Sequence, residues 1–292
     1  MTIPSRKRTP VCLETDRNFD DLAPRFARNV YGGLKGELRL AVLRRDFQEF
    51  LPQALLPAAV PTTVPATVPA KRLRVLDAGG GQGQFSLQLA ACGHHVTLCD
   101  ISIEMLNLAR QQAVQEELTD VEFVHSSIQE LTGQVQSGDR EPFDLVLCHS
   151  VLEWVADQQG LLQMLPSLLR VDGHLSLTFY NRHGLVMKNL LRGRRPPILD
   201  NDFLPSAGSL TPTRPLDPQQ VLQWMRPDVW QILCHSGIRV FHDLLLTEEG
   251  RAMPASELVS LELELSRQEP WRSLGRYQHV LAKRLCAAGQ TG

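Results

Sequence analysis

The sequence lacks the features that define several classes of protein. Its six cysteines form no CxxC pair and no cysteine–histidine cluster at zinc-finger spacing, so we expect neither a disulfide framework nor a metal site. No stretch of about 18 consecutive apolar residues is present, and no apolar run of signal-peptide length follows the basic start. We therefore expect no contact with a membrane and a cytoplasmic location.

A large net charge is also lacking. The 30 Lys and Arg against 32 Asp and Glu give a formal net charge of -2, which excludes a uniformly basic nucleic-acid-binding protein. The charge is nevertheless uneven. Residues 1–45 hold ten basic and five acidic side chains, residues 99–172 hold three and thirteen, and residues 173–240 hold eight and four. If the two basic blocks meet in space, they produce a polarised surface.

What the sequence does contain is a regular alternation of strand and helix signals in its central part. Short apolar runs predict strands at 73–78, 95–100, 121–126, 143–150 and 174–181. Helical periodicity predicts helices at 84–92, 103–117 and 161–170, the second with Ser102 as its N-cap. This order is typical of an α/β fold with a doubly wound, Rossmann-like and mostly parallel sheet that carries helices on both faces.

The flanking parts differ from this core. A helical segment at about 19–51 precedes a linker at 52–70 that has five prolines and no charge. After the core, a helix at 255–267 lies between strand-like segments at 237–246 and 277–285, which suggests an antiparallel hairpin at the sheet edge. We therefore divide the chain into an N-terminal part (1–72), a core (73–181) and a substrate-recognition part (182–292) within one elaborated domain.

A glycine-rich loop follows the first predicted strand. Residues 77–83 read DAGGGQG, which places glycines where a ligand approaches the backbone beyond the strand ends. Gln84 stands where a dinucleotide-binding loop has another glycine, so a pyrophosphate fits less well. Asp100 closes the second strand, where a carboxylate accepts both hydroxyls of a ribose.

With VLDAGGGQG and LCD in these positions, residues 73–181 resemble the class I S-adenosylmethionine-dependent methyltransferases. The resemblance implies S-adenosylmethionine as the cofactor, with Gly79 and Gly80 at its methionine part and Asp100 at its ribose. Ile128 and Gln129 would flank the adenine, and His149 would lie beside the cofactor.

A narrower resemblance extends over nearly the whole chain. It is carried by DRNFDD (16–21), RNVYGGLKGELR (28–39), HSVLEWV (149–155), FYNRHGL (179–185), GIRVFHD (237–243) and RQEPWRSLGRYQHV (267–280). These segments are similar to the bacterial tRNA 5-carboxymethoxyuridine methyltransferases, which esterify the carboxylate of that wobble nucleoside. The resemblance implies a tRNA anticodon loop as the partner, and it implies that Arg39 pairs with the cofactor's methionine carboxylate. The proline-rich segment at 52–70 departs from this family.

A carboxylate substrate changes what the site must supply. It is ionised at neutral pH, since its reference pKa is about 4, and it needs no general base. Orientation then matters more than proton transfer. The candidates for holding the carboxylate or the uracil ring are Tyr31, Tyr180, Arg239 and His242, and for each of them a packing or surface role is an equal alternative. We expect Trp154 to belong to the core.

A basic tract follows the fifth predicted strand. Its cations are Arg182, Lys188, Arg192, Arg194 and Arg195, and residues 182–195 contain no acid. Such cations suit RNA phosphates, although a solvated helix has the same composition. Two other functions stay open: a small-molecule carboxyl or hydroxyl methyltransferase, and a non-catalytic protein that binds S-adenosylmethionine or RNA.

Overall fold

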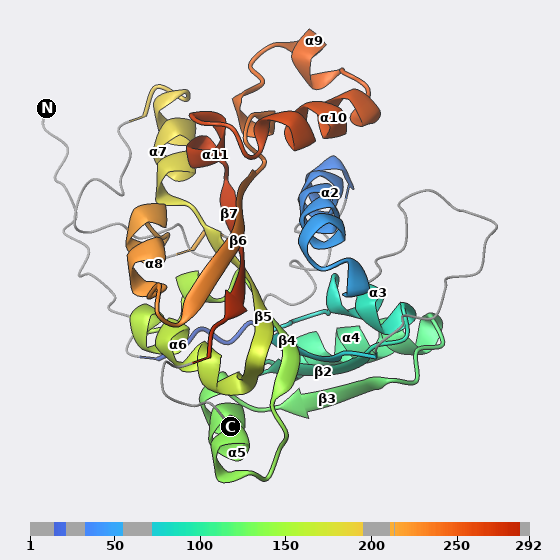
Figure 1. Ribbon diagram of the computed structural model, residues 1–292. Helices are drawn as coiled ribbons and strands as arrows, with labels where there is room; N and C mark the ends of the chain where they lie inside the picture. The colour runs from blue at the N-terminus through green and yellow to red at the C-terminus, as the bar shows by residue number, and fades with distance from the viewer. Residues whose placement is uncertain (1–14, 22–32, 55–71, 195–210, 213, 287–292) are drawn as a thin grey trace, which may run out of the picture.

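A seven-stranded sheet organises the molecule (Figure 1). The computed structural model describes residues 15–21, 33–54, 72–194, 211–212 and 214–286. The strand order is β3–β2–β1–β4–β5–β7–β6. The strands are β1 (Arg74–Ala78), β2 (His95–Asp100), β3 (Val121–His125), β4 (Phe143–His149), β5 (Leu169–Tyr180), β6 (Trp230–Ile238) and β7 (Tyr277–Arg284).

The pairing of the strands confirms the predicted class. β1 pairs in parallel with β2 and β4, β2 with β3, and β4 with β5. β7 is antiparallel to both of its neighbours, and its first residue, Tyr277, lies opposite Tyr180 of β5 and Ile238 of β6. The sheet is thus mostly parallel, with an antiparallel pair at one edge. The carboxyl ends of β1, β2, β4 and β5 consequently share one edge of the sheet with the start of β7.

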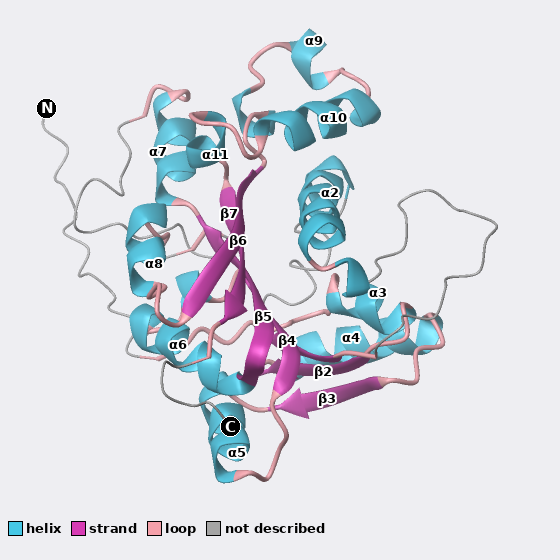
Figure 2. Ribbon diagram, viewed as in Figure 1, coloured by secondary structure: helices cyan, strands magenta, loops and turns pink. Residues whose placement is uncertain are grey.

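Helices cover both faces of the sheet (Figure 2). The longer helices are α2 (Gly33–Phe50), α3 (Ser86–Ala91), α4 (Ile103–Gln115), α5 (Ile128–Ser137), α6 (Gln158–Met164), α7 (Arg182–Leu190), α8 (Pro218–Trp224) and α10 (Ala255–Leu265). Apolar side chains of α2 and α3 pack on one face of β1, β2 and β4, while those of α5, α6 and α8 pack on the other. This two-sided packing explains why the central strands read as continuous apolar runs. None of the described helices combines the length and apolar character that crossing a membrane requires.

Three helical expectations need correction. Residues 128–137, which we had not predicted as helical, form α5, with Ser127 as its N-cap. The helix predicted at 161–170 ends as α6 at Met164, and a 3-10 turn (η3, Leu165–Leu168) containing Pro166 follows it, because proline has no N–H for a helical hydrogen bond. The helix predicted at 19–51 begins at Gly33 in the described residues, while residues 22–32 lie outside them.

Two further predictions were also inaccurate. The strand expected at 237–246 is shifted: β6 ends at Ile238, because Arg239 has a positive φ of 57° and the backbone turns there. A 3-10 turn, η5 (His242–Leu244), comes next. Of the proline-rich linker at 52–70, Pro52–Ala54 form a 3-10 turn (η1) rather than extended chain, and residues 55–70 lie outside the described part.

Candidate active site

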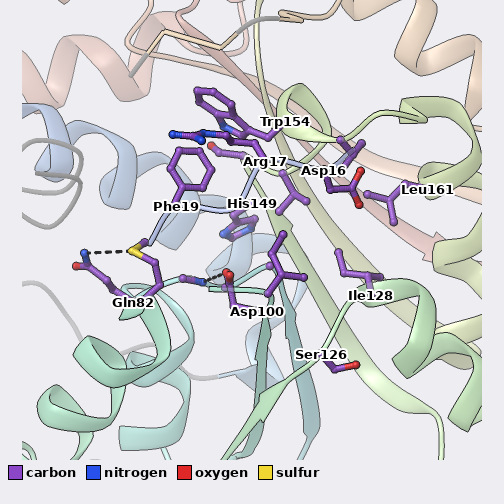
Figure 3. A pocket seen from close by; sticks show the side chains of 18 of the residues that line it. Asp16, Arg17, Phe19, Gln82, Asp100, Ser126, Ile128, His149, Trp154 and Leu161 are labelled. Carbon is purple, nitrogen blue, oxygen red and sulfur yellow. Dashed lines mark hydrogen bonds between the residues drawn. The ribbon is translucent and has the colours of Figure 1, made fainter. Parts of the chain in front are cut away.

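A cavity of about 910 Å³, part of it open to solvent, lies at the carboxyl ends of β1, β2 and β4 (Figure 3). This is the edge at which doubly wound sheets bind ligands. All seven residues that the sequence assigned to the cofactor line this cavity: Arg39, Gly79, Gly80, Asp100, Ile128, Gln129 and His149. They come from α2, the β1–α3 loop, β2, α5 and β4, so the fold brings distant segments together at one place.

The glycine loop forms the floor of the cavity and leaves no room for side chains. The backbone N–H groups of Gly79 and Gly80 both donate to the Cys99 carbonyl, at 2.8 and 3.1 Å. A Cβ at Gly79 would lie 2.7 Å from Val151, and Gly79 has a φ of 68° that favours glycine. A Cβ at Gly80 would lie 2.4 Å from the carboxyl carbon of Asp77. A ligand at this point therefore meets bare backbone.

Asp100 is fixed beside this loop by two backbone donors. The N–H of Gly81 donates to Oδ2 and the N–H of Ser102 donates to Oδ1, each at 2.8 Å. Burial raises the pKa of Asp100, while these two hydrogen bonds oppose the rise. Each carboxylate oxygen accepts more than one hydrogen bond, so the pair of oxygens can also receive two hydroxyls from a ribose. The chemistry of Asp100 and of the glycine loop fits S-adenosylmethionine.

The mouth of the cavity is covered by residues whose role the sequence did not reveal. Asp16, Arg17 and Phe19 line it, and the Phe19 ring meets the Trp154 ring edge to face at 4.8 Å. The Arg17 N–H donates to the Trp154 carbonyl at 3.0 Å. Trp154 therefore lines the cavity, and the expectation that it belongs to the core was wrong. The sequence carries no local signal that residues 16–19 pack against Trp154, which lies far along the chain. The segment DRNFDD was, however, one of those that carried the family resemblance.

His149 belongs to a chain of hydrogen bonds that leads away from the cavity. Its Nε2 lies 2.8 Å from Ser176 Oγ, which lies 2.9 Å from His279 Nε2. The other nitrogen of that ring, Nδ1, is 2.7 Å from Asp46 Oδ2 on α2. Burial, together with His279 and Arg39, holds the pKa of His149 well below its usual range. His149 is therefore neutral. It can contact a ligand as an oriented dipole, but not as a cation.

The proton positions along this chain are linked. If His279 is neutral, Ser176 donates to it and accepts from His149 Nε2–H, so Nδ1 of His149 is a hydrogen-bond acceptor. If His279 is protonated, the direction reverses and Nδ1 of His149 becomes a donor. Asp46, at the far end of this hydrogen-bond chain, thus affects whether Nδ1 of His149 donates or accepts a hydrogen bond.

Asp46 also belongs to the one group of described residues whose geometry could hold a metal ion, with Cys234 and His279. Its Oδ1 accepts hydrogen bonds from Arg45 at 2.8 Å and from Arg267 at 2.6 Å. Burial raises the pKa of Asp46, but His279 and Arg45 outweigh burial and hold it well below its usual range. With two guanidinium groups at this carboxylate, the arrangement fits a buried ion-pair cluster better than a cation site.

The candidates for holding the substrate carboxylate lie elsewhere. Tyr180, Arg239 and His242 do not line the cavity. They gather instead with Asp243 and Arg276 at the carboxyl end of β5, where the Arg276 Nη1 donates to the Tyr180 hydroxyl at 2.7 Å. Tyr31, the fourth candidate, lies outside the described residues.

The basic tract begins directly after β5. Arg182 and Lys188 lie on α7, and Arg192 and Arg194 follow it in an exposed turn. Lys188 is half-buried, and Arg195 lies outside the described residues.

Comparisons with known proteins agree with this geometry. Residues 69–201 match the family model described as a methyltransferase domain, and these residues carry most of the cavity. The fold and the cavity thus define a methyltransferase of the doubly wound class, whose cofactor is S-adenosylmethionine. The chain is 41% identical over 270 residues to the tRNA 5-carboxymethoxyuridine methyltransferase of Escherichia coli, which covers 92% of this chain and 97% of the relative. The chain belongs to the family of tRNA 5-carboxymethoxyuridine methyltransferases.

More distant relatives share only parts of this likeness. The ubiquinone biosynthesis O-methyltransferase of Haemophilus ducreyi is 35% identical over 109 residues, or 37% of this chain and 46% of its own. Among solved structures, the magnesium protoporphyrin IX methyltransferase of Synechocystis has a TM-score of 0.52 at 18% identity, covering 92% of this chain and 96% of its own. The [4+2]-cyclase SpnF gives 0.52 at 17%, covering 91% and 93%. The structural likeness supports the fold alone.

Proposed function

We propose that this protein transfers the methyl group of S-adenosylmethionine to the carboxylate of 5-carboxymethoxyuridine at the wobble position of tRNA, giving the methyl ester. The observation that carries the proposal is the single cavity in which all seven predicted cofactor residues meet. The 41% identity to the Escherichia coli enzyme, over almost the full length of both chains, supports the choice of substrate.

In this proposal each cofactor residue has a separate task. Asp100 binds the ribose hydroxyls, and Gly79 and Gly80 lie against the methionine part. Arg39, which is only 3% exposed, pairs with the methionine carboxylate. Ile128 and Gln129 lie on either side of the adenine, and the neutral ring of His149 contacts the cofactor from β4.

The bound cofactor supplies an electrophilic methyl group on a sulfonium. The protein's own residues then need only to align the substrate carboxylate with that methyl group, because the carboxylate is already deprotonated at neutral pH. Holding two groups in attack geometry supplies several kcal/mol of the barrier without any general base. A low pKa for His149 is compatible with this mechanism, since no proton is transferred.

The tRNA is held by its anticodon loop. Single-stranded loops present unstacked bases, which proteins read most readily. The cations Arg182, Lys188, Arg192, Arg194 and Arg195 contact phosphates beside the loop, while Tyr180, Arg239 and His242 face the modified base. Residues 1–72 and 182–292 complete the substrate side of the core at 73–181, and the protein acts in the cytoplasm on folded tRNA.

Mass spectrometry of wobble nucleosides tests this function directly. Cells that lack the gene should accumulate tRNA with the free carboxylate and lose the methyl ester, and the ester should return with a plasmid copy. Unchanged nucleosides would contradict the proposal and favour a small-molecule methyltransferase. Tight binding of S-adenosylmethionine without turnover on any RNA would favour a non-catalytic protein.

A further inference from the structure

A second polar site lies at the same edge of the sheet as the cofactor cavity, and it has an excess of positive charge. Arg276 precedes β7 and is 3% exposed. Its Nε donates to Asp243 at 2.9 Å, and Arg239 donates to the other oxygen of the same carboxylate. Lys188 of α7 lies near these groups and makes no ion pair or hydrogen bond with any described residue. Two guanidinium groups thus share one ionised carboxylate, and Lys188 lies close enough to interact with that carboxylate electrostatically.

Two guanidinium donors in this cluster have no hydrogen-bond partner in the described part of the chain. They are the Nη2 of Arg276 and the Nε of Arg239, and both are buried. The Tyr180 oxygen accepts from Arg276, so its own O–H is available to donate. Leaving a buried donor of a cationic group unpaired is unfavourable, and the binding of an anion removes this cost.

The electrostatics of the cluster point the same way. Burial, together with Arg276, Arg192 and Arg239, lowers the pKa of Lys188 to about 8, although Asp243 opposes them. Burial raises the pKa of Asp243, but His242, Arg276 and Arg239 outweigh it and hold the pKa well below the usual range.

An acid on another element also faces the cluster. Glu262 of α10 accepts from the backbone N–H groups of Arg239 and Val240, and burial raises its pKa to about 7. Glu262 therefore cancels only part of the excess charge. The field at the centre of the cluster attracts an anion.

Two aromatic rings, those of Tyr277 and Tyr180, lie between this cluster and the cofactor cavity. The Arg39 guanidinium, which lines the cavity, lies 4.0 Å above the centre of the Tyr277 ring. The Tyr277 ring meets the Tyr180 ring edge to face at 5.2 Å, and the Arg276 guanidinium lies 5.6 Å from the centre of the Tyr180 ring. The short helix α11 (Trp271–Leu274), which leads into Arg276, packs against α7, which carries Lys188 (Figure 1).

We propose that Arg276, Arg239 and Lys188, with the Tyr180 hydroxyl, form an anion-binding site for the RNA substrate. An arginine fork matches the two oxygens of a carboxylate or of a phosphate diester, and both are present at a carboxymethoxyuridine in RNA. The inference rests on the proposed function. It adds Arg276, whose Nη2 has no hydrogen-bond partner among the described residues, to the residues that bind the substrate, and it places Lys188 in the same site.

Binding measurements with three stem-loop RNAs test this site and distinguish the two anions. The RNAs carry carboxymethoxyuridine, its methyl ester or plain uridine at the wobble position, and affinity is measured by fluorescence anisotropy. The variants are Lys188→Gln and the charge-preserving Arg276→Lys. Lys283→Gln serves as a matched control, because Lys283 lies on the opposite end of β7 and pairs with Asp172.

If the site holds the carboxylate, both variants should lose at least about tenfold affinity for the carboxylate RNA and little for the other two. If it holds a phosphate, they should lose affinity for all three RNAs equally. Wild-type affinity for every RNA in both variants would overturn the proposal. Calorimetry with S-adenosylhomocysteine should give unchanged affinity, which excludes an effect through the cofactor. Methylation by the wild-type protein is measured in parallel, so that a failure of the proposed function is seen separately.

Discussion

Asp100 is the side chain on which the proposed cofactor geometry depends most. Its two oxygens are aimed by the N–H groups of Gly81 and Ser102, so the carboxylate is already oriented before a ligand arrives. A preorganised acceptor loses little entropy on binding, and its hydrogen bonds to hydroxyls are charge-assisted.

Asp100→Ala should therefore weaken the binding of S-adenosylhomocysteine by about 100-fold, because two charge-assisted hydrogen bonds are lost. Isothermal titration calorimetry measures the effect. The control is Glu104→Ala, which removes an exposed acid from the first turn of α4 and should leave the affinity unchanged. Near-normal affinity in a folded Asp100→Ala variant would rule out the ribose contact.

Glu153 leads to a prediction about pH. It is 1% exposed, its Oε1 accepts from the Tyr180 N–H at 3.1 Å, and burial raises its pKa to about 8. At pH values between the pKa of Glu153 in the unfolded chain and about 8, the folded protein keeps the Glu153 carboxyl protonated. The unfolded chain releases this proton in the same pH range. The free energy of unfolding must then fall as pH rises through this window.

Relative to Glu153→Gln, the wild type should lose about 1.4 kcal/mol of unfolding free energy per pH unit between pH 5 and about 8. Urea unfolding at a series of pH values gives this difference in slope. The exposed substitution Glu104→Gln should keep the wild-type slope. Parallel pH profiles for the wild type and Glu153→Gln would show that Glu153 is ionised when folded.

At the scale of elements, the chain from His149 through Ser176 and His279 to Asp46 joins β4, β5, β7 and α2. Ser176 is fully buried and is the only hydroxyl between the two rings in the described chain. Removing it leaves two buried ring nitrogens without partners.

Ser176→Ala should lower the free energy of unfolding by about 1–3 kcal/mol, because buried polar atoms lose their hydrogen bonds. It should also weaken cofactor binding by a few fold, since the His149 ring is no longer held. Thermal unfolding and calorimetry measure the two effects, and Ser137→Ala, an exposed hydroxyl at the end of α5, is the control. Unchanged cofactor affinity in Ser176→Ala would separate the hydrogen-bond chain from the site.

The elements that could be predicted are those with a local signal. The strands and most of the helices between Arg74 and Tyr180 follow from apolar periodicity, although α5 was missed, and the N-cap at Ser102 was found where expected. The end of β6 could not be predicted, because the turn at Arg239 is held by Glu262, which lies on a different element. The same holds for residues 16–19, whose place over the cavity depends on Trp154 and not on their own sequence.

At the scale of the whole molecule, the near-neutral net charge conceals a division of charge between elements. The acidic block at 99–172 contains the end of β2, all of β3 and β4, and the helices beside them. The basic tract follows β5 at the edge where the cavity opens. A basic region next to the site gives a polyanion a favoured approach.

Replacing Arg192 and Arg194 together by Gln should weaken tRNA binding equally for all tRNA sequences, because phosphate contacts carry no sequence information. The slope of log affinity against log salt should fall by about 1 for each lost phosphate contact. Arg226→Gln, an exposed arginine that pairs with Asp228, is the matched control. Unchanged salt dependence in the double variant would remove this tract from the RNA interface.

The most direct test of the central claim is methyl transfer with purified components. The protein is incubated with tRNA bearing 5-carboxymethoxyuridine and with S-adenosylmethionine labelled in its methyl group, and the nucleosides are analysed by mass spectrometry before and after mild alkali. We predict one labelled methyl group on the wobble nucleoside, which alkali removes because it is an ester. No label on that nucleoside, or a label that resists alkali, would contradict the proposed reaction.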